Sequence, residues 1–214
     1  PANEELLHAK DSGMFNTEQF NVLISEKNML ERNVLLKKIL CSILSSTNSS
    51  ESKKMIFKWI VNKWGGINFK NINKLYDSVI KFLDKNNLNT QKLSFDSIAS
   101  VTKVLSFVCP EKYIIYDARV AYSVNWILLK TGASKMFFPM PESRNSKLNA
   151  VDISTLIRLS NINNYESKVG TKHMISNSDK EVFIDKSMAY TTLCDLIMKV
   201  NNRLWDDDRK EYPF

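Results

Sequence analysis

The sequence is short of glycine, proline, cysteine and histidine, and each shortage excludes a class of protein. Its 214 residues include only 5 Gly and 5 Pro, too few for a sandwich or barrel built from many tight turns. The cysteines are odd in number, far apart and set in apolar surroundings: Cys41, Cys109 and Cys194. This pattern favours free buried thiols in a reducing compartment over a disulfide framework.

Histidine is equally scarce. His8 and His173 are the only two, and neither has a second metal ligand at helical spacing, so we expect no zinc site. A Ser-His-Asp or Cys-His site is poorly supported, because only these two side chains could serve as its base. No four-cysteine iron–sulfur motif is present either. The sequence therefore predicts a protein that uses no metal and no other cofactor.

Long apolar runs are also missing. No run approaches the length of a membrane span, and the first residues, PANEELLHAK, contain no signal-peptide core. We therefore expect a cytoplasmic protein that does not enter a membrane. The length suits one domain over residues 1–214 or two small lobes that share a cleft, and 43% hydrophobic residues are enough for a sizeable core.

Positive charge is in excess. Lys and Arg number 30 against 23 Asp and Glu, which gives a formal charge of +7 and a pI of about 9.2. This balance favours a polyanionic partner, with nucleic acid ahead of an anionic membrane surface.

The apolar pattern is helical almost throughout and predicts an all-α fold. The predicted helices cover residues 30–46, 52–64, 68–85, 95–108, 118–131, 150–161 and 180–205. Gly65-Gly66 is expected to end the second of them at a C-cap. Residues 160–181 form a polar stretch, and Tyr113–Tyr116 is the one extended candidate, too short to build a sheet.

A long loop is predicted for residues 131–149, whose prolines and small polar residues oppose regular structure. The loop nevertheless carries Met136, Phe137, Phe138 and Met140, which a solvated loop would not need. These side chains either pack on the core or present an apolar surface to a ligand.

Two charged residues stand out in the centre of the chain. Asp117 ends the extended run and opens the next helix, so it is expected to cap that helix by accepting the amide hydrogen of Arg119 or Val120. A carboxylate fixed in this way can stabilise a developing cation or take a proton. Lys103 lies in an apolar helix, where it either extends to solvent or lies near a low-dielectric pocket as a reactive amine. Fourteen positions separate the two, so their charged ends could meet.

Trp64-Gly65-Gly66 admits two interpretations. In the first, Trp64 packs in the core and the glycines form a C-cap. In the second, the glycines let the backbone approach a phosphate or base, and Trp64 serves as a stacking platform. The surrounding lysines are either a solvated face or a DNA-facing rim. They are Lys53, Lys54, Lys58, Lys63, Lys70 and Lys74.

The segment KVLSFVCPEKYIIYDARVAYSV resembles the catalytic stretch of the helix-hairpin-helix DNA glycosylases. In that family an apolar helix leads through a Pro-containing turn to an extended apolar run, an aspartate and a further helix. The Asp-x-Arg-Val-Ala form is nearest to the archaeal 8-oxoguanine branch. The resemblance covers about 30 residues closely. The chain departs from the family in having no glycine in SFDSIASVTKV and a shorter spacing between lysine and aspartate.

The resemblance implies an all-α, two-lobed fold with duplex DNA bound across a central cleft. It implies an enzyme that excises a damaged or modified base, with Asp117 assisting glycosidic bond cleavage and Lys103 attacking the sugar C1′. The target nucleotide would be flipped out of the stack, in repair or in defence against phage. Trp64, Gly65, Gly66, Lys63, Lys70 and Arg119 are then the expected DNA contacts, and Phe137 and Phe138 the expected contacts of the base.

Two other hypotheses compete with this one. The chain could be a non-catalytic helical module that binds nucleic acid or a protein through the same basic face, with Asp117 as a cap only. It could also be a purely structural helical protein whose charge reflects codon bias.

Overall fold

The structure, a computed structural model, describes residues 3–84, 93–143, 146–166 and 174–204. Within them it is all-α, as predicted, and its one β contact is an isolated bridge between Phe137 and Phe183. In chain order the elements are α1 (Asn3–Asp11), α2 (Thr17–Ser25), α3 (Met29–Ser46), α4 (Ser50–Trp59), the π-helix η1 (Ile60–Trp64), α5 (Ile72–Leu83), the 3-10 helix η3 (Phe95–Ser97), α6 (Ile98–Val108), α7 (Ala118–Thr131), α8 (Ser146–Ala150), α9 (Ile153–Ser160), α10 (Asn163–Glu166), α11 (Met174–Val182) and α12 (Ala189–Leu204).

Several predicted boundaries were wrong. The helix over 52–64 is α-helical only to Trp59 and continues as the π-helix η1. The helix over 180–205 is two helices, because Phe183 leaves α11 to pair with Phe137 and α12 starts only at Ala189. The polar stretch over 160–181 contains α10 and part of α11. The prediction over 118–131 agrees with α7 residue for residue.

The chain divides into two compact units. Unit 1 comprises Pro1–Gln91, Ser100–Ile115 and Ile197–Phe214, and unit 2 comprises Lys92–Ala99 and Tyr116–Leu196. Helices α6 and α12 contribute residues to both units.

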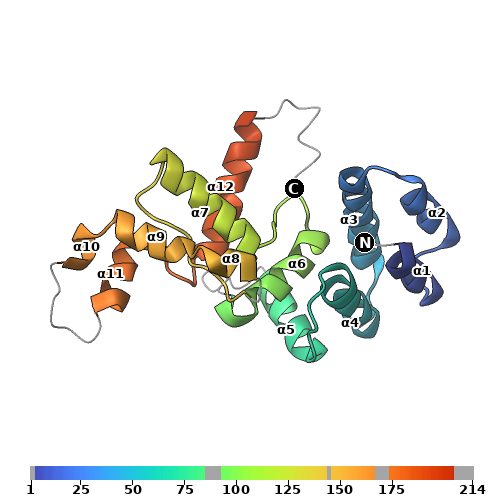
Figure 1. The fold of residues 1–214 in the computed structure, drawn as a ribbon. Helices are drawn as coiled ribbons and strands as arrows, with labels where there is room; N and C mark the ends of the chain where they lie inside the picture. Colours follow the sequence, from blue (N-terminus) through green and yellow to red (C-terminus); the bar gives the residue numbers. More distant parts are fainter. Residues whose placement is uncertain (1–2, 85–92, 144–145, 167–173, 205–214) are drawn as a thin grey trace. The chain divides into compact units, whose positions relative to one another are not determined.

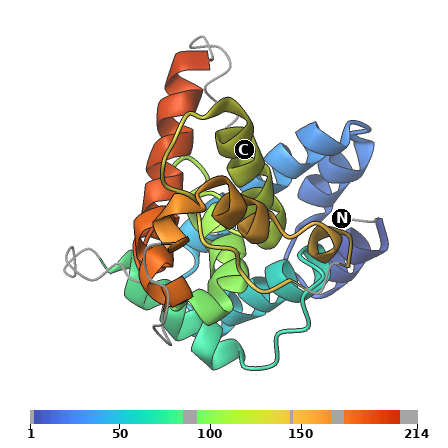
Figure 2. The ribbon, with the colours of Figure 1, turned by 60° about the vertical axis from the view of Figure 1, so that its left-hand side comes forward.

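Unit 1 is a helical assembly built on amphipathic faces. α1 packs on α2 and α2 on α3 (blue in Figure 2), while α4 lies beside α5 (Figure 1). The buried face of α5 repeats every three to four residues, with Leu75, Val79 and Phe82 almost inaccessible. Trp59 joins α4 to the N-terminal helices, since its ring meets Phe15 edge-on and its indole N–H donates to the carbonyl of Glu5 at 3.3 Å.

Unit 2 is organised around α7, which runs beside α8 and α9 (Figure 1). Its core is the set Phe137, Ile153, Ile157, Tyr165 and Val182. The segment 133–143 packs against this core, because the Phe137 amide donates to Val182 at 2.9 Å and its carbonyl accepts from Ile184 at 2.9 Å.

Asn125 on α7 makes a pair of buried hydrogen bonds that fixes the loop in unit 2. Its side chain is fully buried and binds both backbone groups of Phe138: the amide nitrogen donates to the Phe138 carbonyl at 2.7 Å, and the amide oxygen accepts from the Phe138 N–H at 2.8 Å. One side chain therefore satisfies two buried backbone groups of the loop.

We expect Asn125→Leu to destabilise the protein by about 2–4 kcal/mol, because both Phe138 groups would stay buried without these partners. Thermal unfolding followed by circular dichroism measures the effect. Ser123→Ala, on the exposed face of the same helix, is the control and should change stability by less than about 0.5 kcal/mol. Equal melting temperatures for the two variants would contradict the role given to Asn125.

Hydropathy identifies no helix among the described residues that is both long and apolar enough to cross a bilayer.

Candidate functional site

Asp117 is the N-cap of α7, as the sequence predicted. Its backbone is extended, and one carboxylate oxygen, Oδ1, accepts from the amides of Arg119 at 3.0 Å and Val120 at 3.1 Å. Both bonds hold the carboxylate against the positive end of the helix dipole. Arg119, in the first turn, is exposed. The arrangement offers a fixed negative charge beside a cationic side chain.

The residue before Asp117 fixes the direction from which the chain enters α7. Tyr116 is fully buried, its hydroxyl donates to the carbonyl of Pro139 at 2.8 Å, and its ring meets Phe95 and Phe138 edge-on. Burial raises the pKa of the Tyr116 phenol well above its usual value, so the hydroxyl stays protonated and keeps donating. Asp117 is therefore held by packing on one side and by its cap on the other.

Lys103 is buried in unit 1, with 7% of its surface exposed. Of the two alternatives left by the sequence, the structure shows the buried one. A methyl group built on Gly65 would come within 2.8 Å of Cδ of Lys103 and within 2.8 Å of the Val61 carbonyl oxygen. The lysine chain thus lies directly on Gly65, and only a glycine leaves room for it there.

The glycine pair ends a π-helical turn. The Gly65 amide donates to Ile60 at 2.8 Å, five residues back, and the Ile67 amide donates to Val61 at 3.0 Å. Gly66 has a φ of 64°, in the left-handed region that favours glycine, and it is exposed. Single π-helical turns are rare and recur at functional sites.

Trp64 is half-buried, and its ring packs against α6. Its ring meets Phe107 edge-on, with centroids 4.9 Å apart, and its indole N–H donates to Oδ1 of Asn33 at 3.0 Å. This favours the core interpretation of Trp64 over a stacking platform. Phe107 follows Lys103 by one helical turn on α6, so the π-turn meets α6 at two successive turns, through Gly65 and Trp64.

A third helix completes this cluster, and sequence reasoning missed it. Asn33, Lys37 and Cys41 recur every four residues on α3 and all contact the same region: Lys37 Nζ lies 5.9 Å from the Phe107 ring centroid, and the Cys41 thiol donates to the Val108 carbonyl at 3.4 Å. Burial lowers the pKa of Lys37 to about 8. The available signal was a polar stripe at a spacing of four inside an apolar helix.

The surrounding lysines are not equivalent. Lys63 and Lys70, expected to contact DNA, are exposed, as are Lys58 and Lys74. Lys54 differs, since its ammonium pairs with Glu51 at 2.9 Å and lies 5.5 Å from the Tyr76 ring centroid. The exposed members of the set are available to a polyanion.

The two phenylalanines expected to contact a base lie in the core of unit 2. Phe137 is 3% exposed and Phe138 2% exposed, and both make the backbone hydrogen bonds described above. The loop packs on the core, which was one of its two predicted roles. Contact with a flipped base would require this packed loop to move, so the burial disfavours that assignment.

Unit 2 also contains a hollow of about 300 Å³, lined by Tyr122, Met140, Pro141, Ser143, Leu148, Asp152 and Ile153. The one carboxylate in its lining caps α9: Asp152 accepts from the Ser154 amide at 3.0 Å and from the Thr155 hydroxyl at 2.7 Å. In the described parts of the chain, no three histidine, cysteine or acidic side chains gather in a way that could hold a metal ion.

The candidate residues are divided between the two units. Lys103, Trp64 and Gly65 belong to unit 1, whereas Asp117 and Arg119 belong to unit 2. A contact between Lys103 and Asp117 stays a prediction made from the sequence.

Comparisons with protein-family models, curated proteins and solved structures find no significant match to this chain.

Proposed function

We propose that this protein is a DNA glycosylase that excises a damaged or modified base from duplex DNA. The observation that carries the proposal is the setting of Asp117, a carboxylate fixed at a helix N-terminus directly after the fully buried Tyr116. This setting occurs in the segment that resembles the catalytic stretch of the helix-hairpin-helix glycosylases. The all-α fold and the exposed lysines are consistent with it.

The chemistry follows from the charge that develops at the sugar. Breaking the bond between C1′ and the base leaves positive charge on the sugar, and the base departs with the bonding electrons. A carboxylate held by two backbone amides cannot turn away from that charge and needs little reorganisation to stabilise it. The nucleotide must first leave the stack, because the glycosidic bond is inaccessible inside the duplex. Asp117 is the residue to which we assign the stabilisation.

The nucleophile that attacks C1′ is either water or the amine of Lys103. The buried position of Lys103 in an apolar helix keeps its amine away from bulk water and fixed on the helix, which suits a nucleophile. Attack by the amine would leave the sugar covalently bound to the protein as a Schiff base and would add an abasic-site lyase step.

A non-catalytic nucleic-acid-binding module is the second candidate. The observation that favours it is that both hydrogen bonds of Asp117 are those of an ordinary helix cap. The two candidates differ in whether any base is released.

A direct assay separates them. The protein is incubated with duplexes that each carry one damaged or modified base, and abasic sites are then revealed by alkali. Strand breaks at one kind of lesion support the glycosylase. Binding without breaks on any duplex supports the module.

DNA binding should weaken steeply with salt, because each neutralised phosphate releases counterions. We expect Lys63→Ala and Lys70→Ala together to reduce the slope of log affinity against log salt by about two. Lys54→Ala, which removes an ammonium already paired with Glu51, is the control and should leave the slope nearly unchanged. Salt-independent binding, or no binding to any DNA, would favour a protein partner or a structural role.

A further inference from the structure

The exposed side of α7 combines basic side chains with a tryptophan. Arg119, Ser123, Trp126 and Lys130 recur at the helical spacing of three and four residues, and all four are exposed. The opposite side, with Ala118, Ala121 and Asn125, is buried in unit 2. The helix therefore presents one continuous polar and aromatic face, which we call the α7 face and define as Arg119, Ser123, Trp126 and Lys130.

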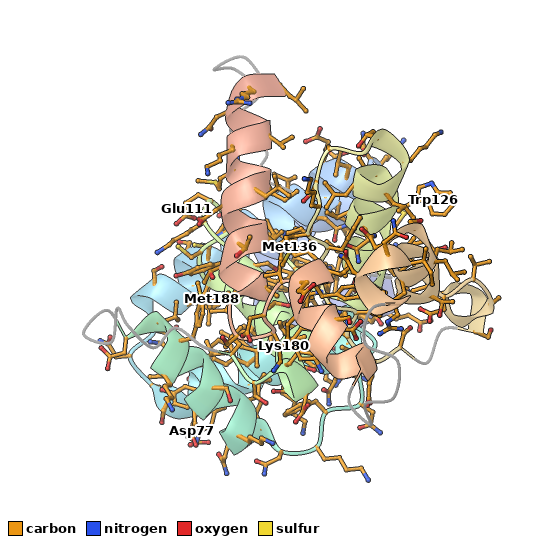
Figure 3. The ribbon with its side chains drawn as sticks, turned by 90° about the vertical axis from the view of Figure 1, so that its left-hand side faces the viewer. Asp77, Glu111, Trp126, Met136, Lys180 and Met188 are labelled. Atoms are coloured by element: carbon orange, nitrogen blue, oxygen red, sulfur yellow. The ribbon has the colours of Figure 1, made fainter. Side chains whose placement is uncertain are left out.

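Trp126 is the centre of this face. It is 45% exposed, and Figure 3 shows its ring projecting outward from α7. Tyr122, one turn earlier, lies almost parallel to it, with 7° between the ring planes and 6.5 Å between the centroids. An exposed tryptophan with a parallel aromatic neighbour is a flat surface already oriented for a third planar group.

The four residues of the α7 face carry only positive charge, although the Asp117 carboxylate lies just before the N-terminal end of the helix. Arg119 and Lys130 stand at its two ends, about 16 Å apart along the helix axis at 1.5 Å per residue. α7 contains no acidic residue along its whole length, ARVAYSVNWILLKT. Two cations that flank an exposed aromatic ring match an unpaired stretch of nucleic acid, in which phosphates flank a free base.

A protein partner is less well matched. Besides Trp126, only Ile127 is a large exposed apolar side chain on α7. This apolar surface is small compared with the area that a stable protein interface buries. The cationic ends would also need acidic groups placed at matching positions.

We propose that the α7 face binds the DNA strand at an unpaired nucleotide, with Trp126 stacking on the unpaired base and Arg119 and Lys130 contacting the flanking phosphates. Every base has a π-face, so the contact would tolerate any sequence. The inference extends the proposed function, because a glycosylase that flips a nucleotide must also hold strand that has lost its pairing.

The test compares two adjacent exposed side chains. Trp126→Ala removes the platform, and Ile127→Ala removes an apolar side chain that is 59% exposed and lies at the edge of the α7 face, one turn from Ser123. Affinity is measured by fluorescence anisotropy for a fully paired duplex and for the same duplex with one unpaired nucleotide. Trp126→Ala should weaken binding to the second duplex about tenfold, because the unpaired base loses the aromatic ring on which it stacks.

The expected pattern has three further parts. Binding to the fully paired duplex changes much less, Ile127→Ala stays within about twofold of the parent, and Trp126→Phe recovers much of the loss because it keeps a stacking ring. An unchanged affinity in Trp126→Ala overturns the proposal, as does an equal loss on both duplexes. Self-association that depends on Trp126, without any affinity for DNA, also overturns it and indicates a protein interface.

The same preparations separate this proposal from the proposed enzymatic function. If Trp126→Ala loses affinity selectively while no preparation releases any base, the α7 face is supported and the glycosylase proposal fails. If Trp126→Ala releases base and binds like the parent, the α7 face is overturned and the glycosylase proposal is unaffected.

Discussion

Asp117→Asn should abolish base release while leaving the fold intact. Asparagine keeps an oxygen that can accept from the Arg119 and Val120 amides, so the cap of α7 survives and the free energy of unfolding should change by well under about 1 kcal/mol. The substitution removes the negative charge, which is the property that the proposed reaction uses. The rate of base release should therefore fall by about two to three orders of magnitude or more. Single-turnover release from the preferred duplex measures it.

A matched control is available in the same unit. Asp152 caps α9 by accepting from the Ser154 amide, so Asp152→Asn makes the same chemical change at another helix N-terminus. We expect this variant to keep normal base release. If Asp117→Asn released base at a nearly normal rate, Asp117 would be a structural cap and no more. A large loss of stability in Asp117→Asn would instead show that the charge holds α7 in place.

Local signals explain what the sequence could predict. Both ends of α7 were predicted to the residue because each is marked by the residue next to it. Asp117 caps the N-terminus, and Gly132 adopts the left-handed conformation after the C-terminus, with a φ of 64°. The all-α class followed from apolar periodicity, which depends on spacing along the chain and not on the partner that covers the face.

Tertiary contacts explain what the sequence could not predict. The contact of Lys103 with Gly65 joins residues 38 positions apart, and nothing in either segment identifies the other. The break after α11 depends on Phe183 pairing with Phe137, so the apolar pattern that suggested one long helix was overridden by a bridge formed elsewhere. Lys37 was overlooked for the same reason, because the Phe107 ring beside its ammonium lies 70 positions further along the chain.

The final prediction is that Lys103 is the covalent nucleophile. Its amine would attack C1′ as the base leaves, and the opened sugar would then form a Schiff base with the lysine. Borohydride added during turnover reduces that imine to a stable secondary amine, so a protein–DNA adduct should appear on a denaturing gel. Lys103→Met should remove the adduct. Methionine is preferred to alanine because it retains an unbranched chain that can lie on Gly65.

Two further variants make the result specific to Lys103. Lys37→Met tests the second amine of the cluster, which is half-buried and whose pKa of about 8 would also suit a nucleophile, and we expect its adduct to persist. Gly65→Ala pushes against Cδ of Lys103 without removing the amine and also crowds the Val61 carbonyl, so it should reduce the adduct yield together with the melting temperature. If the adduct is lost in Lys37→Met and kept in Lys103→Met, the two lysines exchange roles. If base is released and no adduct is ever trapped, water is the nucleophile, and Lys103 supports the π-turn by packing on Gly65.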